Sequence, residues 1–317
     1  MNPDRVFRDR PLAPLTTLRA GGSAEQFYFA RDSEDLAEAA QYLHEHDLEP
    51  TILGSGSNVL PSDQGVPGFT LYNRSTRIAV SPDGEVLADS GAAFQDLFLK
   101  TAQAGLEGFS YAVGIPGSVG GALASNAGAY RSCIAEFLTG VEVVEAGKRE
   151  WISPDALELS YRDSRLRRGD SGRCVVIKLR FELRPGDPRT IYDEARDYQR
   201  QRISKQPPPA SAGSFFKNVY DQALADSLPD LPERLRAGGV VPSGFLIEGA
   251  GLRGHRIGGA MLAERHANFI VNIGRATASE IRSLAEFAKE RVMDRFGVEI
   301  EEEVLYLGDW SGWKPVG

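Results

Sequence analysis

Cysteine is scarce in this sequence, because Cys133 and Cys174 are the only two among 317 residues. Their separation is not the CxxC spacing of a redox motif, and they do not form a metal-binding cluster. The four histidines likewise lack a ligand spacing such as HExxH. We therefore expect two thiols in a reducing compartment, a cytoplasmic protein, and no catalytic metal.

Long apolar runs and excess positive charge are also lacking. No apolar run reaches the roughly 18 residues of a membrane-spanning helix, and the first eight residues lack the apolar core of a signal peptide. The 36 Lys and Arg residues against 44 Asp and Glu residues give a net charge of −8. Such a balance argues against a general nucleic-acid binder but allows a local basic pocket for a phosphorylated substrate.

The residues that are present indicate a soluble globular protein, with 42% hydrophobic and 25% charged residues. A length of 317 residues exceeds one ordinary core and suits two or three domains. Helices and strands are interleaved without a regular βαβ rhythm, which favours an α+β fold. The expected helices cover 32–43, 94–102, 188–203 and 277–296. Asp32 caps the first of them, and the last begins with a capping box of Thr277 and Glu280, has an apolar face that includes Ile281 and Leu284, and ends at Gly297. The expected strands cover 51–53, 78–80, 86–88, 141–144, 175–181 and 298–307, with a hairpin turn at 83–84.

Two glycine-rich loops run from Gly54 to Leu60 and from Ile115 to Gly121. Glycine lets backbone N–H groups approach a pyrophosphate closely, because no Cβ intervenes. Neither loop ends in the Gly-Lys-Ser/Thr of a Walker A sequence, which disfavours a nucleoside triphosphatase. The pair suggests a bound dinucleotide and redox chemistry, although each loop alone is also explained as a structural turn.

A third glycine-rich segment matches GxGxxG from Gly249 to Gly254. A dinucleotide-binding fingerprint opens an amphipathic helix and has an acidic residue about 20 positions further on. Neither feature follows here, so we interpret this match as a helix end and a turn.

The segment from Ser211 to Asn218 places a hydroxyl, an ammonium and an amide close together in the chain. Ser214 is a candidate proton donor if a neighbouring group needs a proton. The alternative interpretation is a serine in a turn.

Together these segments resemble the UDP-N-acetylenolpyruvoylglucosamine reductase family, whose members are also called UDP-N-acetylmuramate dehydrogenases. The resemblance runs from about Leu15 to Gly308. Its motifs occur in the family's order at 17–22, 54–60, 115–130, 161–164, 213–218, 254–259, 266–272 and 301–304. One such motif is a weak signal, whereas eight in register are a strong one.

The resemblance implies two FAD-binding lobes of the PCMH-like type, at 1–75 and 76–200, and a substrate-binding domain at 201–302. The C-terminal strand, 303–317, is expected to join the first lobe. The implied cofactor is non-covalent FAD, with NADPH as the hydride donor. The implied substrate is UDP-N-acetylglucosamine enolpyruvate, which is reduced to UDP-N-acetylmuramate for peptidoglycan synthesis. We expect a monomer with no nucleic-acid partner and no membrane span.

Three catalytic residues follow from the resemblance. Arg162 matches a cation beside the substrate carboxylate, where charge develops on an enolate. Ser214 matches the proton donor, and Glu303 matches a glutamate that helps to stabilise the intermediate. Without the motif, Arg162 would be a surface arginine in a basic run. Strand alternation puts Glu301 and Glu303 on one face; the motif selects Glu303, and the other two glutamates of the run are expected to be solvated.

Ligand contacts also follow from the resemblance. Lys205 suits a diphosphate as a point charge, and His266 is either a substrate contact or a structural histidine. The implied FAD-binding residues are Gly54, Ser55, Gly56, Ser57, Asn58, Val59, Ile115, Pro116, Gly117, Ser118, Gly121, Ala122, Asn126, Gly128 and Ala129. The implied substrate-binding residues are Tyr130, Arg202, Lys205, Lys217, Asn218 and His266.

Two departures from the family pattern are visible. Thr16 stands where the family commonly has Asn. Between Phe181 and Arg202 there is no room for the tyrosine-bearing loop that one subclass folds over the substrate. This chain therefore resembles the subclass without that loop, and the sequence does not reveal which element covers the uridine.

Two rival functions are left open. A flavin-dependent oxidase of the same wider fold group is one, but many of those enzymes tether FAD through a histidine or cysteine, and neither glycine loop contains one. A non-catalytic protein that binds a nucleotide sugar is the other. The filled catalytic positions argue against it.

Overall fold

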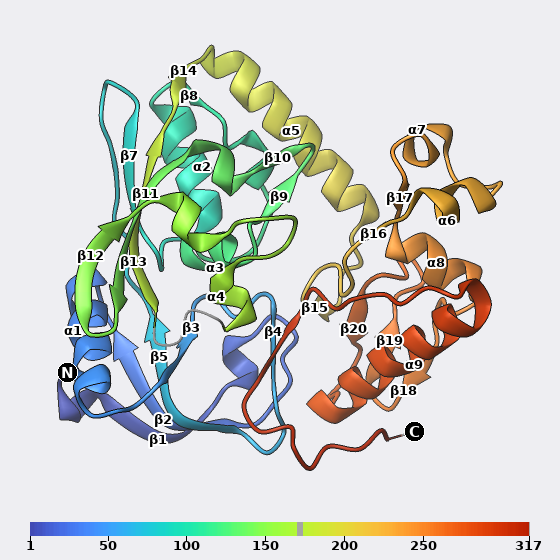
Figure 1. The fold of residues 1–317 in the computed structure, drawn as a ribbon, viewed down its shortest axis with the longest axis horizontal. Coiled ribbons are helices and arrows are strands. Elements are labelled where there is room, and N and C mark those ends of the chain that lie inside the picture. The colour runs from blue at the N-terminus through green and yellow to red at the C-terminus, as the bar shows by residue number, and fades with distance from the viewer. Residues whose placement is uncertain (170–173, 317) are drawn as a thin grey trace. The chain divides into compact units, whose positions relative to one another are not determined.

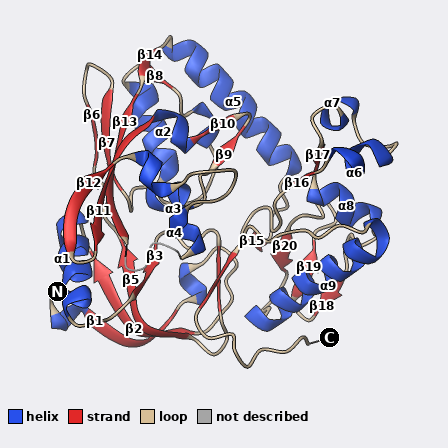
Figure 2. Ribbon diagram, viewed as in Figure 1, coloured by secondary structure: helices blue, strands red, loops and turns tan. Residues whose placement is uncertain are grey.

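The computed structural model describes residues 1–169 and 174–316. Contacts within the chain define two compact units, which we call the first and second units. The first consists of Met1–Arg10, Ala24–Gly56 and Pro67–Ser204, and the second of Pro11–Ser23, Ser57–Val66 and Lys205–Gly317. Both contain helices and strands, which confirms the α+β class (Figures 1 and 2). The division into three domains stays a prediction.

Two sheets form the framework of the first unit. One has the strand order β1-β2-β5-β3, with β3 and β5 parallel. The other has the order β12-β11-β13-β7-β6, and its neighbouring strands are antiparallel. Their bounds are β1 Val6–Pro11, β2 Ser23–Ala30, β3 Pro50–Leu53, β5 Val66–Asn73, β6 Ile78–Val80, β7 Glu85–Asp89, β11 Leu138–Glu145, β12 Lys148–Ile152 and β13 Val175–Glu182. The expected hairpin is confirmed, with Val80 opposite Val86.

Helices of the first unit are α1 Ser33–Glu45, α2 Phe94–Gln103, α3 Val119–Ala124, α4 Arg165–Arg168 and α5 Pro188–Lys205. Asp32 caps α1 by accepting a hydrogen bond from the Asp35 N–H over 2.9 Å, as its position predicts. The short elements are η1 Pro3–Arg5, η3 Ser110–Ala112, η4 Ile134–Phe137, η5 Pro154–Leu157, and the strand pairs β8 Leu106–Glu107 with β14 Arg184–Pro185 and β9 Gly128–Ala129 with β10 Ser132–Cys133. The helices expected at 32–43, 94–102 and 188–203 are therefore confirmed.

Alternating side chains of β13 build the core of the first unit. Val175, Ile177, Leu179 and Phe181 are buried, while the residues between them are half-buried. The Phe181 ring meets the Phe109 ring edge-on, with centroids 5.2 Å apart. Such contacts add to the energy of apolar burial that holds the sheet against α2 and α3.

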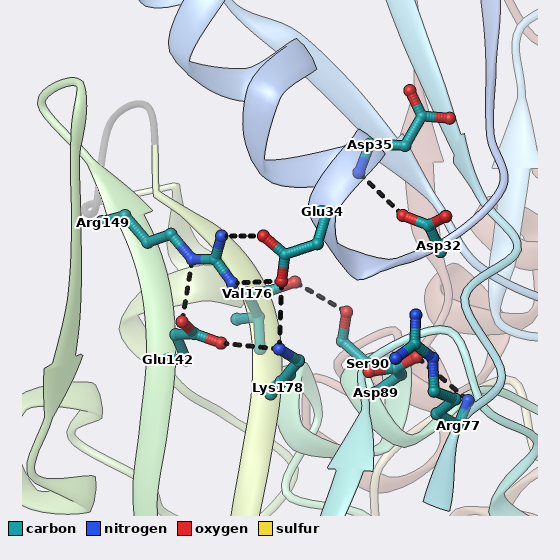
Figure 3. Close-up of polar contacts among 10 residues, drawn as sticks. All are labelled: Asp32, Glu34, Asp35, Arg77, Asp89, Ser90, Glu142, Arg149, Val176 and Lys178. Carbon is teal, nitrogen blue, oxygen red and sulfur yellow. Dashed lines mark hydrogen bonds and ion pairs between the residues drawn. The ribbon is translucent and has the colours of Figure 1, made fainter.

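An ion-pair network ties α1 to the five-stranded sheet of the first unit. The Arg149 side chain donates to Glu142 and to Glu34, each over 2.8 Å, and Lys178 donates to Glu34 over 3.3 Å. Figure 3 shows the Glu34 carboxylate of α1 pointing at both cations. The hydrogen bond from Arg149 is the main cause that lowers the pKa of Glu34 to about 2.

The second unit contains a sheet of order β15-β20-β19-β18, which is antiparallel. Its strands are β15 Ala210–Ser211, β18 Arg256–Ile257, β19 Ala260–Leu262 and β20 Ile270–Asn272, and smaller pairs are β4 Val59–Pro61 with β21 Leu305–Leu307 and β16 Val219–Tyr220 with β17 Val240–Val241. Its helices are α6 Gln222–Ser227, α7 Glu233–Arg236, α8 Ser243–Gly249, α9 Ala278–Phe296 and the turn η2 Ala13–Leu15. β18 follows the GxGxxG match, with no amphipathic helix directly after it, so the match is indeed a helix end and turn.

Helix α9 agrees with its sequence signals at both ends. Thr277 accepts from the Glu280 N–H over 3.1 Å and Glu280 accepts from the Thr277 N–H over 3.0 Å, which is the predicted capping box. Gly297 takes the left-handed conformation, with φ 67°, and ends the helix. The predicted apolar stripe that includes Ile281 and Leu284 is fully buried.

The strand expected over 298–307 is wrong for most of its length. Only β21, Leu305–Leu307, is a regular strand, and Phe216 and Glu302 form an isolated antiparallel bridge. The run of three glutamates has low strand propensity, and Ile300 and Val304 instead bury their side chains in the core of the second unit. The strand-alternation argument for Glu301 and Glu303 therefore rests on a single bridge.

Candidate functional site

Within the first unit the two glycine loops meet at Gly54 and Ser118. A Cβ added at Gly54 would lie only 2.3 Å from the Ser118 Oγ. That hydroxyl oxygen also accepts from the Gly121 N–H over 3.2 Å and so caps α3. Sequence reasoning missed this short helix inside the second loop, although Ser118 was a visible cap signal. The loops therefore pack directly against each other, and position 54 has no room for a side chain.

Backbone conformation explains the other key glycines. Gly56 has φ 63° and Gly117 has φ 142°, in a region that favours glycine. Of the remaining predicted cofactor residues in the first unit, Ser55, Pro116 and Gly121 are exposed, Ile115 and Ala129 are half-buried, and Ala122 is buried. These exposed residues, together with glycines that carry no side chain, fit the dinucleotide cradle that the loops suggested.

Asn126 and Arg162 fix the segment that follows α3. Asn126 is buried in the left-handed region, with φ 40°, and its amide donates to the Ser160 carbonyl over 2.8 Å. Arg162 donates from Nη2 to the Gly128 carbonyl over 2.6 Å. The predicted catalytic arginine therefore lies against a predicted cofactor glycine. The Asn126 side chain makes its hydrogen bonds to the protein backbone, so its role is to position the segment after α3.

Arg202 and Tyr130 lie together in the same unit. The Arg202 guanidinium carbon is 5.6 Å from the Tyr130 ring centroid, and Nη2 donates to the Tyr111 carbonyl over 3.2 Å. Burial lowers the pKa of Arg202, and the nearby Arg162 cation acts in the same direction. Two neighbouring cations, each beside a tyrosine ring, are suited to an anionic ligand.

In the second unit, the first glycine loop contacts the C-terminal segment. The Asn58 side chain donates to the Glu303 carbonyl over 2.9 Å, and the Leu305 N–H donates to the Asn58 carbonyl over 3.0 Å. Val59 then pairs with Leu305 in the parallel β4–β21 pair. The Ser57 carbonyl accepts from the Thr17 hydroxyl over 3.3 Å. The loop that is predicted to hold the cofactor thus holds the backbone of the predicted catalytic glutamate.

Ser214 and Glu303 belong to neighbouring extended segments. The Glu303 N–H donates to the carbonyl of Phe215, the residue after Ser214, over 2.7 Å. Asn268 fixes the other edge of this segment: its carbonyl accepts from the Phe215 N–H over 2.6 Å and its side chain bonds both backbone groups of Phe216. Ser214 is half-buried. Sequence reasoning did not single out Asn268, although it lies within the motif at 266–272.

Two of the three C-terminal glutamates have cationic partners. Lys217 Nζ bonds Glu301 over 2.5 Å, and Lys289 Nζ bonds Glu302 over 3.2 Å. The Glu302 side chain is only 16% exposed, so the expectation of a solvated charge is wrong for Glu302. Glu301 is exposed, but its charge is matched by a predicted substrate lysine. Asn218, beside Lys217, is half-buried.

His266 is half-buried near Lys205. Its Nδ1 accepts from the Asn268 N–H over 3.3 Å. Burial lowers the pKa of His266, and the Lys205 and Arg253 cations add to this while Glu248 opposes it. Two predicted substrate residues, Lys205 and His266, are thus close enough to interact electrostatically. The imidazole is neutral near pH 7.

Neither a metal centre nor a membrane span is found in the described part of the chain. Among residues 1–169 and 174–316, no three or more His, Cys, Asp and Glu side chains are grouped so that they could hold a metal ion. Within the same ranges, no helix combines the length and the apolar character needed to cross a bilayer.

Comparison with known proteins defines the class first. Residues 24–150 match the family model "FAD binding domain", which includes both glycine loops. Residues 203–307 match the model "UDP-N-acetylenolpyruvoylglucosamine reductase, C-terminal domain". The chain is therefore a flavin-binding protein with a second domain of defined type.

Relatives along the whole chain then define the family. The UDP-N-acetylenolpyruvoylglucosamine reductase of Trichormus variabilis is 38% identical over 95% of this chain and 86% of its own, and that of Rubrobacter xylanophilus is 37% identical over 95% of both. The crystal structure of the Thermus caldophilus enzyme matches with a TM-score of 0.75 and 30% identity, over 96% of this chain and 99% of that one. The chain belongs to the UDP-N-acetylenolpyruvoylglucosamine reductase family, and it is a flavin-dependent oxidoreductase.

Proposed function

We propose that this enzyme reduces UDP-N-acetylglucosamine enolpyruvate to UDP-N-acetylmuramate with NADPH, in the synthesis of peptidoglycan precursors. The observation that carries the proposal is the match to reductases of that name over 95% of the chain. Bound FAD would transfer the two electrons from NADPH to the enolpyruvyl group. The absence of a histidine or cysteine from both glycine loops supports non-covalent binding.

We propose that the glycine cradle of the first unit holds the FAD diphosphate. Gly54, Gly56 and Gly117 keep side chains away, and Ser118 caps the short helix beside them. Asn58 and Val59 extend the first loop into the second unit. Backbone N–H groups in such a cradle oppose phosphate charge without the desolvation cost of a lysine.

Arg162 is proposed to oppose the negative charge that develops on the substrate carboxylate during reduction. An enolate distributes charge onto that carboxylate, and a cation held in place beforehand lowers the barrier. The 2.6 Å hydrogen bond to the Gly128 carbonyl and the contact with the Tyr161 ring at 5.4 Å support this role, because both restrict the guanidinium.

Ser214 is proposed to donate the proton that completes the lactyl group at C2, and Glu303 to stabilise the intermediate. A hydroxyl is a weak acid, so its position must be fixed. The hydrogen bonds that Phe215 makes with Glu303 and Asn268 supply that restraint directly beside Ser214. Ser214 would then regain its proton from solvent.

The proposed substrate contacts are the cations and polar groups at Tyr130, Arg202, Lys205, Lys217, Asn218 and His266. Lys205 is exposed and offers a point charge for the diphosphate. We further propose a monomeric, cytoplasmic enzyme with two flavin-binding lobes and a substrate domain, divided near residues 75 and 200. Size-exclusion chromatography with light scattering tests the monomer.

A steady-state assay tests the function. Purified protein should be yellow, and denaturation should release the flavin. NADPH oxidation should depend on UDP-N-acetylglucosamine enolpyruvate, and UDP-N-acetylmuramate should accumulate in equal amount. Oxidation that depends only on O₂, with no lactyl product, would support a flavin oxidase and contradict the proposal.

A further inference from the structure

One face of helix α5, the long yellow helix in Figure 1, carries an apolar and aromatic stripe. Ile191 and Ala195 are buried in the core of the first unit, and Tyr198 packs against the same core. Arg202 follows one turn later. The spacing of three and four residues places all four side chains on one side of the helix. The core therefore fixes the direction in which Tyr198 and Arg202 project.

Tyr198 stacks on Tyr130, the predicted substrate tyrosine. The two ring centroids are 3.8 Å apart, and the ring planes differ by 10°. The Tyr130 hydroxyl donates to the Tyr198 carbonyl over 3.2 Å, and the Tyr198 hydroxyl donates to the Glu194 carboxylate over 2.8 Å. One helix thus restrains both the plane and the hydroxyl of the Tyr130 ring.

The backbone at Tyr130 needs such restraint. Tyr130 has φ 55° and Arg131 has φ 71°, so two successive residues other than glycine occupy the left-handed region. Such conformations are uncommon for large side chains and persist where surrounding contacts hold them. The stack and the hydroxyl bond are contacts of this kind.

Arg202 completes the arrangement. Its guanidinium lies near the Tyr130 ring and is bonded to the Tyr111 carbonyl. Among the residues that the structure describes, no carboxylate lies within ion-pair distance of Arg202. An anion brought to this group would therefore meet a cation whose charge is not already matched.

We propose that Tyr198 is a positioning residue for substrate binding, which acts by holding Tyr130 and thereby the Tyr130–Arg202 pair that receives the anionic part of the UDP-sugar. This inference rests on the proposed function. Tyr198 itself contacts no reacting atom: its contribution is to remove the freedom of Tyr130 before the substrate arrives, which reduces the cost of binding.

Three variants of the FAD-loaded enzyme test this role. Tyr198→Leu removes the stack and should raise KM for the UDP-sugar, and its Kd by calorimetry without NADPH, by roughly three- to tenfold. Flavin reduction by NADPH should be unchanged. Tyr198→Phe keeps the stack and loses only the bond to Glu194, so it should restore nearly wild-type KM and Kd.

The matched control is Tyr192→Leu on the same helix. Tyr192 is 37% exposed and meets Phe98 edge-on, at a centroid distance of 6.3 Å. Its loss should lower the melting temperature without raising KM. If Tyr198→Leu lowers the melting temperature but leaves KM and Kd at wild-type values, the tyrosine is merely structural and the inference is overturned.

A double-mutant cycle shows whether Tyr198 acts through Tyr130. In a Tyr130→Ala background, Tyr198→Leu should have no further effect on KM or Kd, because the ring that Tyr198 holds is absent. Additive effects would overturn the inference. A wild-type enzyme that does not turn over the UDP-sugar would instead refute the proposed function, so the two failures are distinguishable.

Discussion

The side-chain amide of Asn58 donates to the backbone carbonyl of Glu303 over 2.9 Å, across 245 positions of sequence. Asn58 comes from a loop predicted to bind FAD, and Glu303 is a predicted catalytic residue. Because the carbonyl and N–H of Glu303 are bonded to Asn58 and Phe215 respectively, its backbone has little freedom. This restraint gives Asn58 a structural role in addition to its predicted contact with FAD.

Replacing Asn58 by Ala should reduce kcat about three- to tenfold, because the loss of one hydrogen bond is worth about 1 kcal/mol. Asn272→Ala is the control, since that side chain bonds the Leu18 and Arg19 carbonyls and the Gly274 and Ala276 N–H groups without contacting Glu303. Because more hydrogen bonds are lost, the control should lower the free energy of unfolding at least as much as Asn58→Ala, yet keep kcat. Equal kcat values for both variants and the wild type would contradict the positioning role.

Gly54→Val should abolish FAD binding in a protein that still folds. Even the first carbon of the side chain would overlap the Ser118 hydroxyl, and relief of that overlap separates the two loops. The measurement is the flavin-to-protein absorbance ratio, with circular dichroism as a check on folding. Gly312→Val is the control, because no atom lies within 4 Å of the added Cβ. Full flavin occupancy in Gly54→Val would place the cofactor elsewhere.

Ser214→Ala should separate the two half-reactions. Flavin bleaching by NADPH needs no proton from Ser214 and should continue at a nearly normal rate. Reoxidation by the UDP-sugar should slow by about 10²–10⁴-fold, which is typical of a lost general acid. Anaerobic stopped-flow absorbance measures both rates. Reoxidation at the wild-type rate would show that another group donates the proton.

His266 should make stability depend on pH in the acid range. Its folded-state pKa is below the ordinary 6.5, so the unfolded chain binds the proton more readily. The stability that the neutral His266 contributes is fully present above pH 6.5. It is lost as the pH falls from 6.5 toward the folded-state pKa. Urea unfolding should show that the free energy of unfolding decreases less from pH 7.5 to pH 5.5 in His266→Gln than in the wild type. An identical decrease would mean that other groups cause it.

Arg149→Met should destabilise the first unit by about 1–3 kcal/mol, because it leaves the Glu142 carboxylate, 8% exposed, with Lys178 at 3.6 Å. Glu34 is 56% exposed and should contribute little to this loss. Arg189→Met is the control: that side chain is 91% exposed and pairs with Asp193 at 4.0 Å. Chemical denaturation compares them. If the free energies of unfolding of Arg149→Met and Arg189→Met differ by less than about 0.5 kcal/mol, the ion-pair network is energetically neutral.

Local signals in the sequence predicted much of the fold. The cap at Asp32, the capping box at Thr277 and the hairpin turn all depend on neighbouring residues, and each is found in the structure. The strand expected over 298–307 was wrong because pairing partners decide whether an extended segment becomes a strand. No local pattern specifies those partners.

The candidate site shows the same division between local and distant information. The glycine loops were visible in the sequence, but their meeting at Gly54 and Ser118 depends on tertiary contacts. Tyr198 lies on the α5 stripe at a helical spacing from Ala195, so periodicity could have predicted that it faces inward. Its stacking on Tyr130 could not be predicted in that way, because the partner is 68 positions away. The roles of Arg162, Ser214 and Glu303 stay predictions.

The parallel pairing of β4 with β21 has a consequence for biosynthesis. Residues 59–61 are synthesised long before their partner strand at 305–307. Until then, the early segment and the buried side chain of Leu60 lack their native neighbours, and a nascent chain must keep them from pairing elsewhere. A truncation that removes β21 would therefore disturb the distant segment around Leu60.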